Sequence, residues 1–452
     1  MCTPALADLT ALQFSNPIEQ AAALANQATY DQLTGGEAPL CDPQSPGPAG
    51  SCTGAVFEMF SNVRELVETA NELTDSGPRR YSLRLDQENL GFALRWTAAE
   101  EMAAQGSSAT QFTNSQLNSL ASRISALRVS ALGAQGGGAS ADDGIAKRWG
   151  GFLNGAFGYG RKDDTTDPFN TGTSASGAED AFDFDGSEIT LGADYRLGES
   201  TVLGALLGFS KRRVDFDSAV SVVDGTIDTD GSSLMFFGLW ESDRFYVSGS
   251  VGGQWLGFDL TRRITYPSLN PLVAPVDVTT TSSTDSNTLM ASVNGGANFN
   301  FGGFALAPYA KAEYQKVSVD DFTEQGASGF EFGYGEQDIR SFQLAAGATL
   351  QYVFTPRFGV IVPYARAEYR QEFENDPRNI SATYASMPSG NVTTAQDFNL
   401  ATDEHDDQFF VVAGGFSVVL KGGLQGFLQY QQVLDLDTFS DRVIAGGIRL
   451  EF

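Results

Sequence analysis

The sequence predicts an all-β transmembrane barrel of about twelve antiparallel strands, preceded by a small α-helical N-terminal region. Three observations support this fold class: the chain ends in a strand with one apolar face, the strand pattern persists from Lys147 onward, and short turns alternate with longer polar loops. No window of about 18 to 20 uninterrupted apolar residues occurs, which excludes a transmembrane helix.

Residues 442–452 form the clearest of the expected strands. Ile444, Ile448, Leu450 and Phe452 share one parity, while small and charged residues dominate the other, which is the period of a strand with one apolar face. Terminal residues fray unless something holds them. In a closed barrel the final strand pairs with the first, and a terminal aromatic suits the membrane interface.

The composition agrees with a barrel and argues against nucleic acid as a partner. Of the 452 residues, 42% are hydrophobic and 11% are aromatic, with 50 Gly and 33 Phe. This profile suits short strands, turns and aromatic girdles. The formal charge of −28 opposes binding of nucleic-acid phosphates, which require Lys and Arg. We interpret this charge as a solvated acidic surface.

The three cysteines, Cys2, Cys41 and Cys52, all precede the expected barrel. Cys41 and Cys52 flank a Pro-, Gly- and Ser-rich segment and can close a small disulfide loop in an oxidising compartment, with free thiols as the alternative. Residues 1–4 have neither the basic nor the apolar region of a signal peptide. Because such a barrel must be exported, we expect a leader that has been removed or replaced.

Residues 1–132 are expected to form a helical N-terminal region. The run Asn16-Pro17-Ile18-Glu19 supplies a capping residue, a proline at the first helical position and an acid three residues after the cap. Apolar residues recur at helical spacing over 56–73, as in an amphipathic helix. Further helices are expected toward the end of 81–105 and after Thr113, where Leu117, Leu120, Ile124 and Leu127 form one stripe.

A Gly-rich linker at 133–146 separates this region from the barrel domain, 147–452. In the barrel domain, apolar residues alternate with polar or small ones. Five short turns are expected near 198–200, 242–244, 302–303, 355–357 and 422–423, and six longer polar loops over 163–183, 217–231, 265–286, 321–338, 374–407 and 435–440. Short turns at one end and long loops at the other are typical of outer-membrane barrels. A soluble β-sandwich is the alternative, but it does not predict this asymmetry.

A repeated motif marks the residues expected to line the pore. Pro308-Tyr309-Ala310-Lys311-Ala312-Glu313-Tyr314 recurs as Pro363-Tyr364-Ala365-Arg366-Ala367-Glu368-Tyr369. The charged parity must face the interior, because Lys or Arg on the lipid face costs about 2–4 kcal/mol at the bilayer midplane. The expected pore-lining residues are therefore Lys311, Glu313, Arg366, Glu368 and Arg370. These charges either fill and hydrate the interior or also form a docking surface for a segment held in the pore.

With these features the chain resembles a type V secretion autotransporter, over about residues 147–452. The resemblance lies in the strand count, in the run 363–373, in the turn Gly422-Gly423-Leu424 and in the closing residues 447–452. Residues 100–128 also resemble the helical segment that precedes the barrel in some members. Two features depart from the family: the N-terminal region has no β-helical repeats, and residues 133–144 are inserted before the first strand.

The resemblance implies a monomeric translocator barrel in the outer membrane of a Gram-negative bacterium, in contact with lipid and lipopolysaccharide. It implies that Ile448, Leu450 and Phe452 belong to a signal for the outer-membrane barrel assembly machinery. The N-terminal region would then lie on the cell surface or in the pore. The alternatives are a porin-like channel plugged by the N-terminal helices, and a surface adhesin or structural protein.

An enzyme is the remaining alternative, and the sequence argues against it. The only histidine is His405, in the longest loop, so the N-terminal region has no Ser-His-Asp or Cys-His arrangement. Neither Gly-x-Ser-x-Gly nor a phosphate-binding glycine motif occurs. Asp228-Thr229-Asp230-Gly231 lacks the remaining ligands of a calcium loop. We therefore expect no catalytic residues, no metal and no cofactor.

Overall fold

The computed structural model describes most of the chain. It covers residues 8–35, 38–102, 104–105, 117, 120, 148–163, 181–198, 200–216, 221–374, 378–402, 407–420, 423–435 and 439–452. Cys2, His405 and the expected linker at 133–146 lie outside these ranges, as does most of the last expected helix.

Among the described residues of the N-terminal region, the complete helices are α1 (Pro17–Thr34), α2 (Ala55–Leu73) and α3 (Gln87–Ala98), with short 3-10 turns η1 (Leu9–Ala11) and η2 (Glu100–Met102). Helix α1 begins as expected, because the Asn16 side chain accepts a hydrogen bond from the Ile18 amide at 2.7 Å. Helix α3 begins only after Asp86, whose side chain caps it by accepting from the Asn89 amide. None of the helices within the described ranges is long and apolar enough to cross a membrane.

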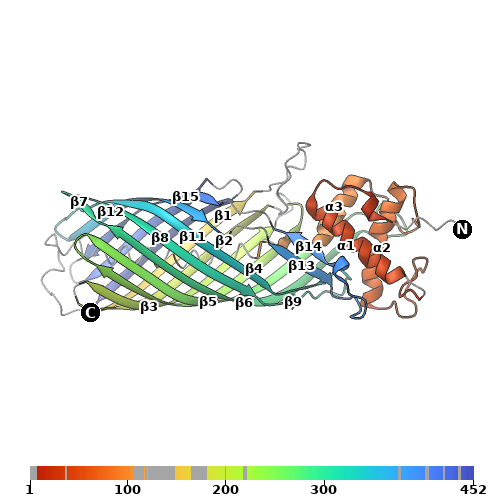
Figure 1. Ribbon diagram of the computed structural model, residues 1–452, viewed down its shortest axis with the longest axis horizontal. Coiled ribbons are helices and arrows are strands. Elements are labelled where there is room, and N and C mark those ends of the chain that lie inside the picture. The colour runs from red at the N-terminus through yellow and green to blue at the C-terminus, as the bar shows by residue number, and fades with distance from the viewer. Residues whose placement is uncertain are drawn as a thin grey trace.

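Twelve strands form a closed antiparallel barrel (Figure 1). They are β1 (Trp149–Lys162), β2 (Phe182–Arg196), β3 (Thr201–Phe216), β4 (Asp224–Glu241), β5 (Phe245–Tyr266), β6 (Val276–Ala297), β8 (Phe304–Val319), β11 (Gln337–Tyr352), β12 (Gly359–Glu372), β15 (Gln408–Leu420), β16 (Leu424–Leu434) and β17 (Phe439–Glu451). The ring closes where β1 pairs with β17, with Gly150 opposite Glu451. A three-residue piece, β7 (Phe299–Phe301), extends the turn before β8. The strand number and the closed barrel confirm the expected fold class.

Alternate residues of each strand face outward and inward. The outward side chains are apolar over the middle of the strands and are bounded by two aromatic rows. The row at the short-turn end includes Trp149, Trp240, Phe245, Phe304, Tyr352 and Phe452, and the row toward the long loops includes Phe157, Phe209, Trp255, Phe342, Tyr369, Phe410 and Tyr430, all of them exposed. Such a band between two aromatic girdles matches the hydrocarbon layer of a membrane.

Two of the expected polar loops, 321–338 and 374–407, are partly folded, which corrects the sequence-based expectation. Their described residues form a four-stranded sheet of β9 (Phe322–Thr323), β10 (Phe332–Tyr334), β13 (Asn379–Tyr384) and β14 (Phe398–Ala401), with the 3-10 turn η4 (Thr394–Gln396) before β14. The rings of Phe332 and Phe398 meet edge to face with centroids 4.6 Å apart. The loops fold because these aromatic side chains have a buried surface to join.

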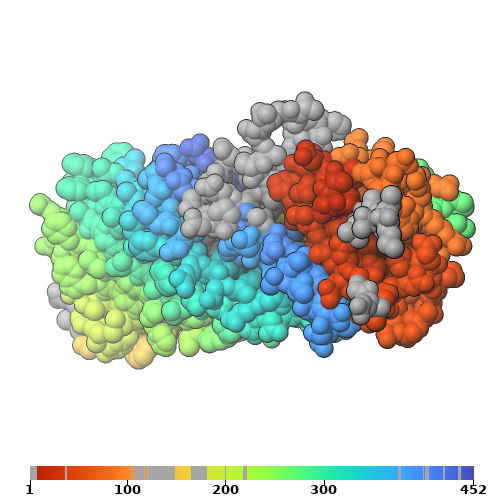
Figure 2. Space-filling view, turned by 45° about the vertical axis from the view of Figure 1, so that its right-hand side comes forward, coloured from red at the N-terminus to blue at the C-terminus, as the bar shows by residue number. Residues whose placement is uncertain are grey.

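That buried surface is a hydrophobic core shared by the helices, the small sheet and the loop-side ends of the barrel strands. It includes Val63 of α2, Leu94 of α3, Phe258 of β5 and Phe332 of β10, each almost fully buried. Figure 1 places the helices at one end of the barrel and the carboxy-terminus at the other. Figure 2 shows the red and orange N-terminal region lying against the blue segment of residues 378–402.

Candidate functional site

An ion-pair network lies on the inner face of β8 and β12. The Lys311 ammonium is 3.0 Å from a Glu313 carboxylate oxygen and 3.2 Å from one of Glu368. The Arg370 guanidinium is 2.5 Å from Glu368 and 3.1 Å from Glu313. All four side chains are at most 7% exposed. Two cations therefore balance two carboxylates inside the barrel, which avoids a buried uncompensated charge.

The network crosses an intervening strand, and a glycine makes the crossing possible. Gly347 of β11 stands opposite Tyr309 of β8 on one side and Glu368 of β12 on the other. The Tyr309 hydroxyl donates to Glu368 across it, at 2.5 Å. A Cβ atom at Gly347 would lie 2.8 Å from the Tyr309 hydroxyl oxygen and 2.7 Å from the Ala367 carbonyl oxygen, so the contact requires glycine.

Arg366, the fifth expected pore-lining residue, lies apart from this network. Its guanidinium donates to the Gln431 side-chain oxygen at 2.6 Å, two strands away on β16. Tyr364 makes the parallel contact, donating to Gln429 at 2.7 Å. The interior therefore contains an ion-pair cluster on β8 and β12 and a separate set of hydrogen bonds between β12 and β16, in which Arg366 and Tyr364 bind neutral side-chain amides.

A second feature of the interior is a pair of leucines that precede the barrel in the sequence. Leu117 and Leu120 are helical and buried, and they pack with inner-face residues Phe152, Val202 and Met235. Gln105, before them, receives a hydrogen bond from Gln337 at the loop side of β11. Trp149, after them, pairs with Phe452 at the short-turn end. Leu117 and Leu120 therefore lie inside the barrel, while Gln105 and Trp149 lie at its two ends.

At the loop side, a buried ion pair within the barrel domain also contacts the N-terminal region. Arg262 of β5 donates to both Glu324 oxygens, at 2.9 and 2.7 Å, and to the Trp96 carbonyl of α3 at 3.4 Å. Both charged side chains are 1% exposed. Glu324 also accepts from the Phe332 amide and the Tyr334 hydroxyl. The pair thus has the additional hydrogen bonds that a buried charge needs.

Further polar contacts join the same two parts of the chain. The Asn62 side chain of α2 donates to the Ser328 carbonyl at 2.9 Å, and Tyr384 of β13 donates to Asn26 of α1 at 2.9 Å. The Asn270 side chain, between β5 and β6, donates to the carbonyls of Arg80 and Ser82 at 3.0 and 2.7 Å. These contacts hold the helical region over the loop-side mouth of the barrel.

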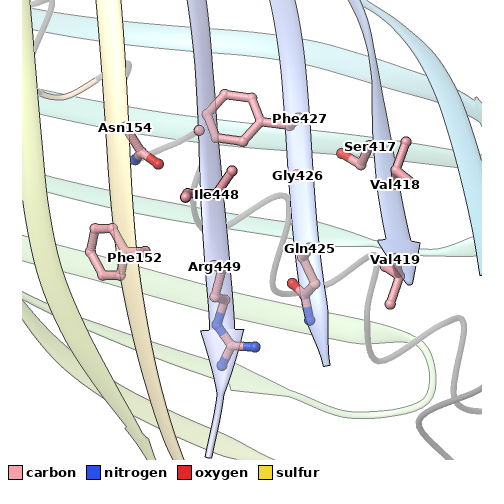
Figure 3. Close-up of a pocket in the computed structure, with 11 residues that line it drawn as sticks. Phe152, Asn154, Ser417, Val418, Val419, Gln425, Gly426, Phe427, Ile448 and Arg449 are labelled. Carbon is pink, nitrogen blue, oxygen red and sulfur yellow. The ribbon is translucent and has the colours of Figure 1, made fainter. Parts of the chain in front are cut away.

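The seam between the first and last strands has an ion pair of its own. Arg449 of β17 reaches over β1 to Asp194 of β2, at 2.7 Å. A Cβ atom at Gly150 of β1 would meet both this guanidinium and the Asp194 carboxylate, so a larger residue there would have to shift the ion pair. Figure 3 shows Phe152 and Asn154 of β1 beside Ile448 and Arg449 of β17, around a small pocket on the seam.

The remaining predicted site residues lie as follows. Ile448, Leu450 and Phe452 point outward from β17 and are 58%, 51% and 63% exposed. Cys41 and Cys52 form a disulfide with Cα atoms 5.1 Å apart, and both are buried. Within the described residues no group of three or more His, Cys, Asp or Glu side chains is placed to hold a metal ion.

The sequence did not identify several residues that make buried ion pairs or cross-strand hydrogen bonds. They are Arg262, Glu324, Tyr309, Asp194 and Arg449. For Arg262 a signal was present, because it shares the parity of the buried residues Phe258, Leu260 and Ile264. A single cation in an apolar row indicates a buried partner. Nothing local in the sequence identifies that partner as Glu324, which is 62 residues away.

The chain is similar to known proteins chiefly through its barrel. A family model described as the autotransporter beta-domain matches residues 166–431. Esterase EstA of Pseudomonas aeruginosa and Esterase EstA of Pseudomonas putida are each 23% identical over 216 residues, which are 47% of this chain and 31% of theirs. The chain thus spans about a third of the length of these curated relatives. The translocator domain of the autotransporter NalP from Neisseria meningitidis has the same fold, with a TM-score of 0.52 and 15% identity, covering 76% of this chain and 98% of that domain.

Proposed function

Because this chain belongs to the autotransporter family, we propose that its barrel carries the N-terminal region, residues 1–132, across the outer membrane and then retains it at the extracellular mouth. The barrel is a translocator β-domain of type V secretion and lies in the outer membrane of a Gram-negative bacterium. Beyond the family assignment, we infer that the N-terminal region stays attached to the barrel and that it lies on the extracellular side.

The main support for retention of the N-terminal region at the barrel is the buried cluster of Arg262, Glu324 and the Trp96 carbonyl. The pair lies within the barrel domain, and its guanidinium also donates to the Trp96 carbonyl of the N-terminal region, so the helices help to bury it. Breaking such a pair costs about 3–5 kcal/mol, because one charge is then left buried without a partner. The core shared by α2, α3 and the strand ends adds to this attachment.

The orientation follows from the two ends of the barrel. Outer-membrane barrels have short turns on the periplasmic side and longer loops outside. The short-turn end carries Trp149 and Phe452, and the helices cover the opposite end. The helical region therefore faces the cell exterior, while Leu117 and Leu120 lie inside the barrel.

We propose that the chain does not hydrolyse esters, although the matched relatives are named esterases. The barrel itself is non-catalytic. In the N-terminal region a Ser-His-Asp triad has no histidine to use, because the single histidine of the sequence is His405. The ionic cluster of Lys311, Glu313, Glu368 and Arg370 is fully paired, so its proposed role is to fill the pore wall.

The proposed partners follow from the outer face. The outward row of Ile448, Leu450 and Phe452 on β17 is an exposed apolar edge that the barrel assembly machinery could recognise during insertion. Closure of β17 on β1 leaves the twelve strands without a free edge, which supports a monomeric barrel.

The deciding experiment labels single cysteines with a membrane-impermeant maleimide in intact cells. Cys41 and Cys52 are buried and bonded, so the reporters are Glu72→Cys on exposed α2 surface and Asp243→Cys in a short turn, each with Cys2→Ser. We expect labelling of the first before permeabilisation and of the second only after it. Protection of both until the outer membrane is opened would contradict the proposal and favour a channel plugged from the periplasm.

A further inference from the structure

The outer face of the barrel changes abruptly from apolar to charged on β2 to β5. One outward row consists of Ile189, Phe209, Ser232 and Trp255, which stand side by side on the four strands. The next outward row toward the loops consists of Ser187, Lys211, Asp230 and Gly257. An aromatic row followed by a charged row marks the membrane interface. Since it lies on the long-loop side, this interface is that of the outer leaflet.

A groove of about 490 Å³ lies on this boundary. Its apolar part is lined by Ile189, Phe209 and Trp255, whose side chains are about half exposed. Its polar part contains Lys211, Asp230 and the hydroxyl residues Ser187 and Ser232. The groove therefore offers an apolar floor that includes the Ser232 hydroxyl, with Ser187 and Lys211 as donors in the row above it.

The cations beside this groove are weakly engaged by the protein. The Lys211 ammonium is 3.1 Å from Asp230, but the two side chains are 79% and 67% exposed. Arg213, one row farther out, makes only long contacts of 3.4 and 3.5 Å to Asp215 and Asp228. Exposed pairs of this kind contribute about 0–1 kcal/mol, so an anionic ligand can displace the carboxylates.

Other outward arginines are held more firmly. Arg161 donates two bonds to Asp183, at 2.6 and 3.1 Å. Arg263 donates two bonds to Asp277, at 2.9 and 3.1 Å, and one to Asp224 at 3.2 Å. A forked guanidinium–carboxylate pair is the strong geometry. Lys211 and Arg213 are therefore the cations that remain available for a ligand in this part of the barrel.

We propose that this groove binds the phosphorylated sugar of lipid A, the membrane anchor of lipopolysaccharide. Lys211 and Arg213 bind a phosphate, Ser187 and Ser232 donate to the sugar or the phosphate, and Phe209 and Trp255 contact the acyl chains and the sugar ring. This ligand places its phosphate and sugar above its acyl chains, as the groove places Lys211 and Ser187 one row farther toward the loops than Phe209 and Trp255. Asp230 opposes the phosphate, so neutralising it should strengthen binding.

Native mass spectrometry of the full chain, folded in detergent and titrated with diphosphoryl lipid A, tests the site. We expect one preferred lipid A molecule per barrel. Lys211→Ala with Arg213→Ala should weaken binding about tenfold or more, and Asp230→Asn should strengthen it. Lys316→Ala is the matched control, because Lys316 is a partly exposed outward lysine paired with Asp338 at 3.1 Å on other strands, and it should leave binding unchanged.

Three outcomes would overturn the site: equal binding by the double variant, equal binding of dephosphorylated lipid A, or equal binding of phosphatidylglycerol. The last two would indicate a general lipid annulus. Heat-modifiable gel mobility checks that each variant is folded. If the double variant does not fold, Lys211→Ala alone must weaken binding and Asp230→Asn must strengthen it, and failure of either change rejects the proposal. The test is made in detergent, so its outcome is independent of where the N-terminal region lies.

Discussion

The Tyr309 hydroxyl on β8 donates a hydrogen bond to Glu368 on β12, two strands away, by passing over Gly347 of β11. The three residues stand in one row across the inner face, and the middle one has no side chain. Tyrosine, glycine and glutamate therefore act as one unit, which ties three neighbouring strands together on the pore wall.

Gly347→Ala should destabilise the barrel by about 1–3 kcal/mol, because the new methyl group overlaps Tyr309 and must displace it. The measurement is the temperature at which the folded band is lost in heat-modifiable electrophoresis. Gly249→Ala on β5 is the matched control, since a Cβ atom there meets only the Ser292 carbonyl oxygen, at 3.5 Å. Equal transition temperatures for the two variants would show that the row contributes no stability.

Arg262 and Arg263 are adjacent on β5, and mutation of Arg262 should destabilise the protein much more than mutation of Arg263. Arg262→Met leaves Glu324 buried without its cation and should cost about 3–5 kcal/mol at the junction with the helices. Arg263→Ala removes only exposed ion pairs and should cost about 0–1 kcal/mol. Limited proteolysis of the folded protein reports the difference, as faster cleavage of the helical region.

A double variant serves as the control for the effect of an unpaired buried charge. In Arg262→Met with Glu324→Met the buried charge is removed together with its partner, so protease resistance should partly recover. Loss of resistance in Arg263→Ala equal to that in Arg262→Met would show that the buried pair does not hold the helical region in place.

The barrel could be predicted because its pattern is local. A period of two, interrupted by turns, fixes which side chains share a face, and the cost of charge on the lipid face assigns Lys311 and Glu368 to the inner parity. Which of these inward-facing side chains bond to one another could not be predicted. Tyr309 pairs with Glu368 and Arg366 with Gln431 because of strand register and the position of Gly347, and both depend on neighbouring strands.

The sequence also did not predict that two of the polar loops are partly folded, for a related reason. Residues 321–338 and 374–407 contain many polar residues and glycines, which predicts loops. Their buried aromatic residues, Phe330, Phe332 and Phe398, become structural only because α1 to α3 and the loop-side ends of the strands cover them. That covering surface comes from residues hundreds of positions away, as in the bond between Tyr384 and Asn26.

The Cys41–Cys52 disulfide should stabilise the segment between the two helices α1 and α2. It closes a short loop with a sequence separation of 11, for which the restriction of the unfolded chain is worth roughly 3 kcal/mol. Cys41→Ser with Cys52→Ser should therefore speed cleavage of residues 42–51 by a nonspecific protease, while Cys2→Ser should leave it unchanged. Unchanged cleavage in the double variant would show that packing alone holds this loop.

Glu65 of α2 should make the helical region less stable as the pH rises. Burial raises the pKa of this carboxyl from 4.5 to about 8, with Glu68 and Glu58 adding to the shift and Arg64 opposing it. Between pH 4.5 and 8 the folded state keeps a proton that the unfolded state has lost. The free energy of unfolding therefore falls as the pH rises through this window, and the penalty is absent below it.

Glu65→Gln removes the titrating group, so the variant should gain on the order of 1–2 kcal/mol over the native chain at pH 8.5 and nothing at pH 4.5. The urea concentration at which the helical region becomes protease-sensitive measures this difference at each pH. Glu72→Gln, at an exposed position of the same helix, should show no such pH-dependent gain. A gain of equal size at both pH values would mean that Glu65 acts through packing rather than through its charge.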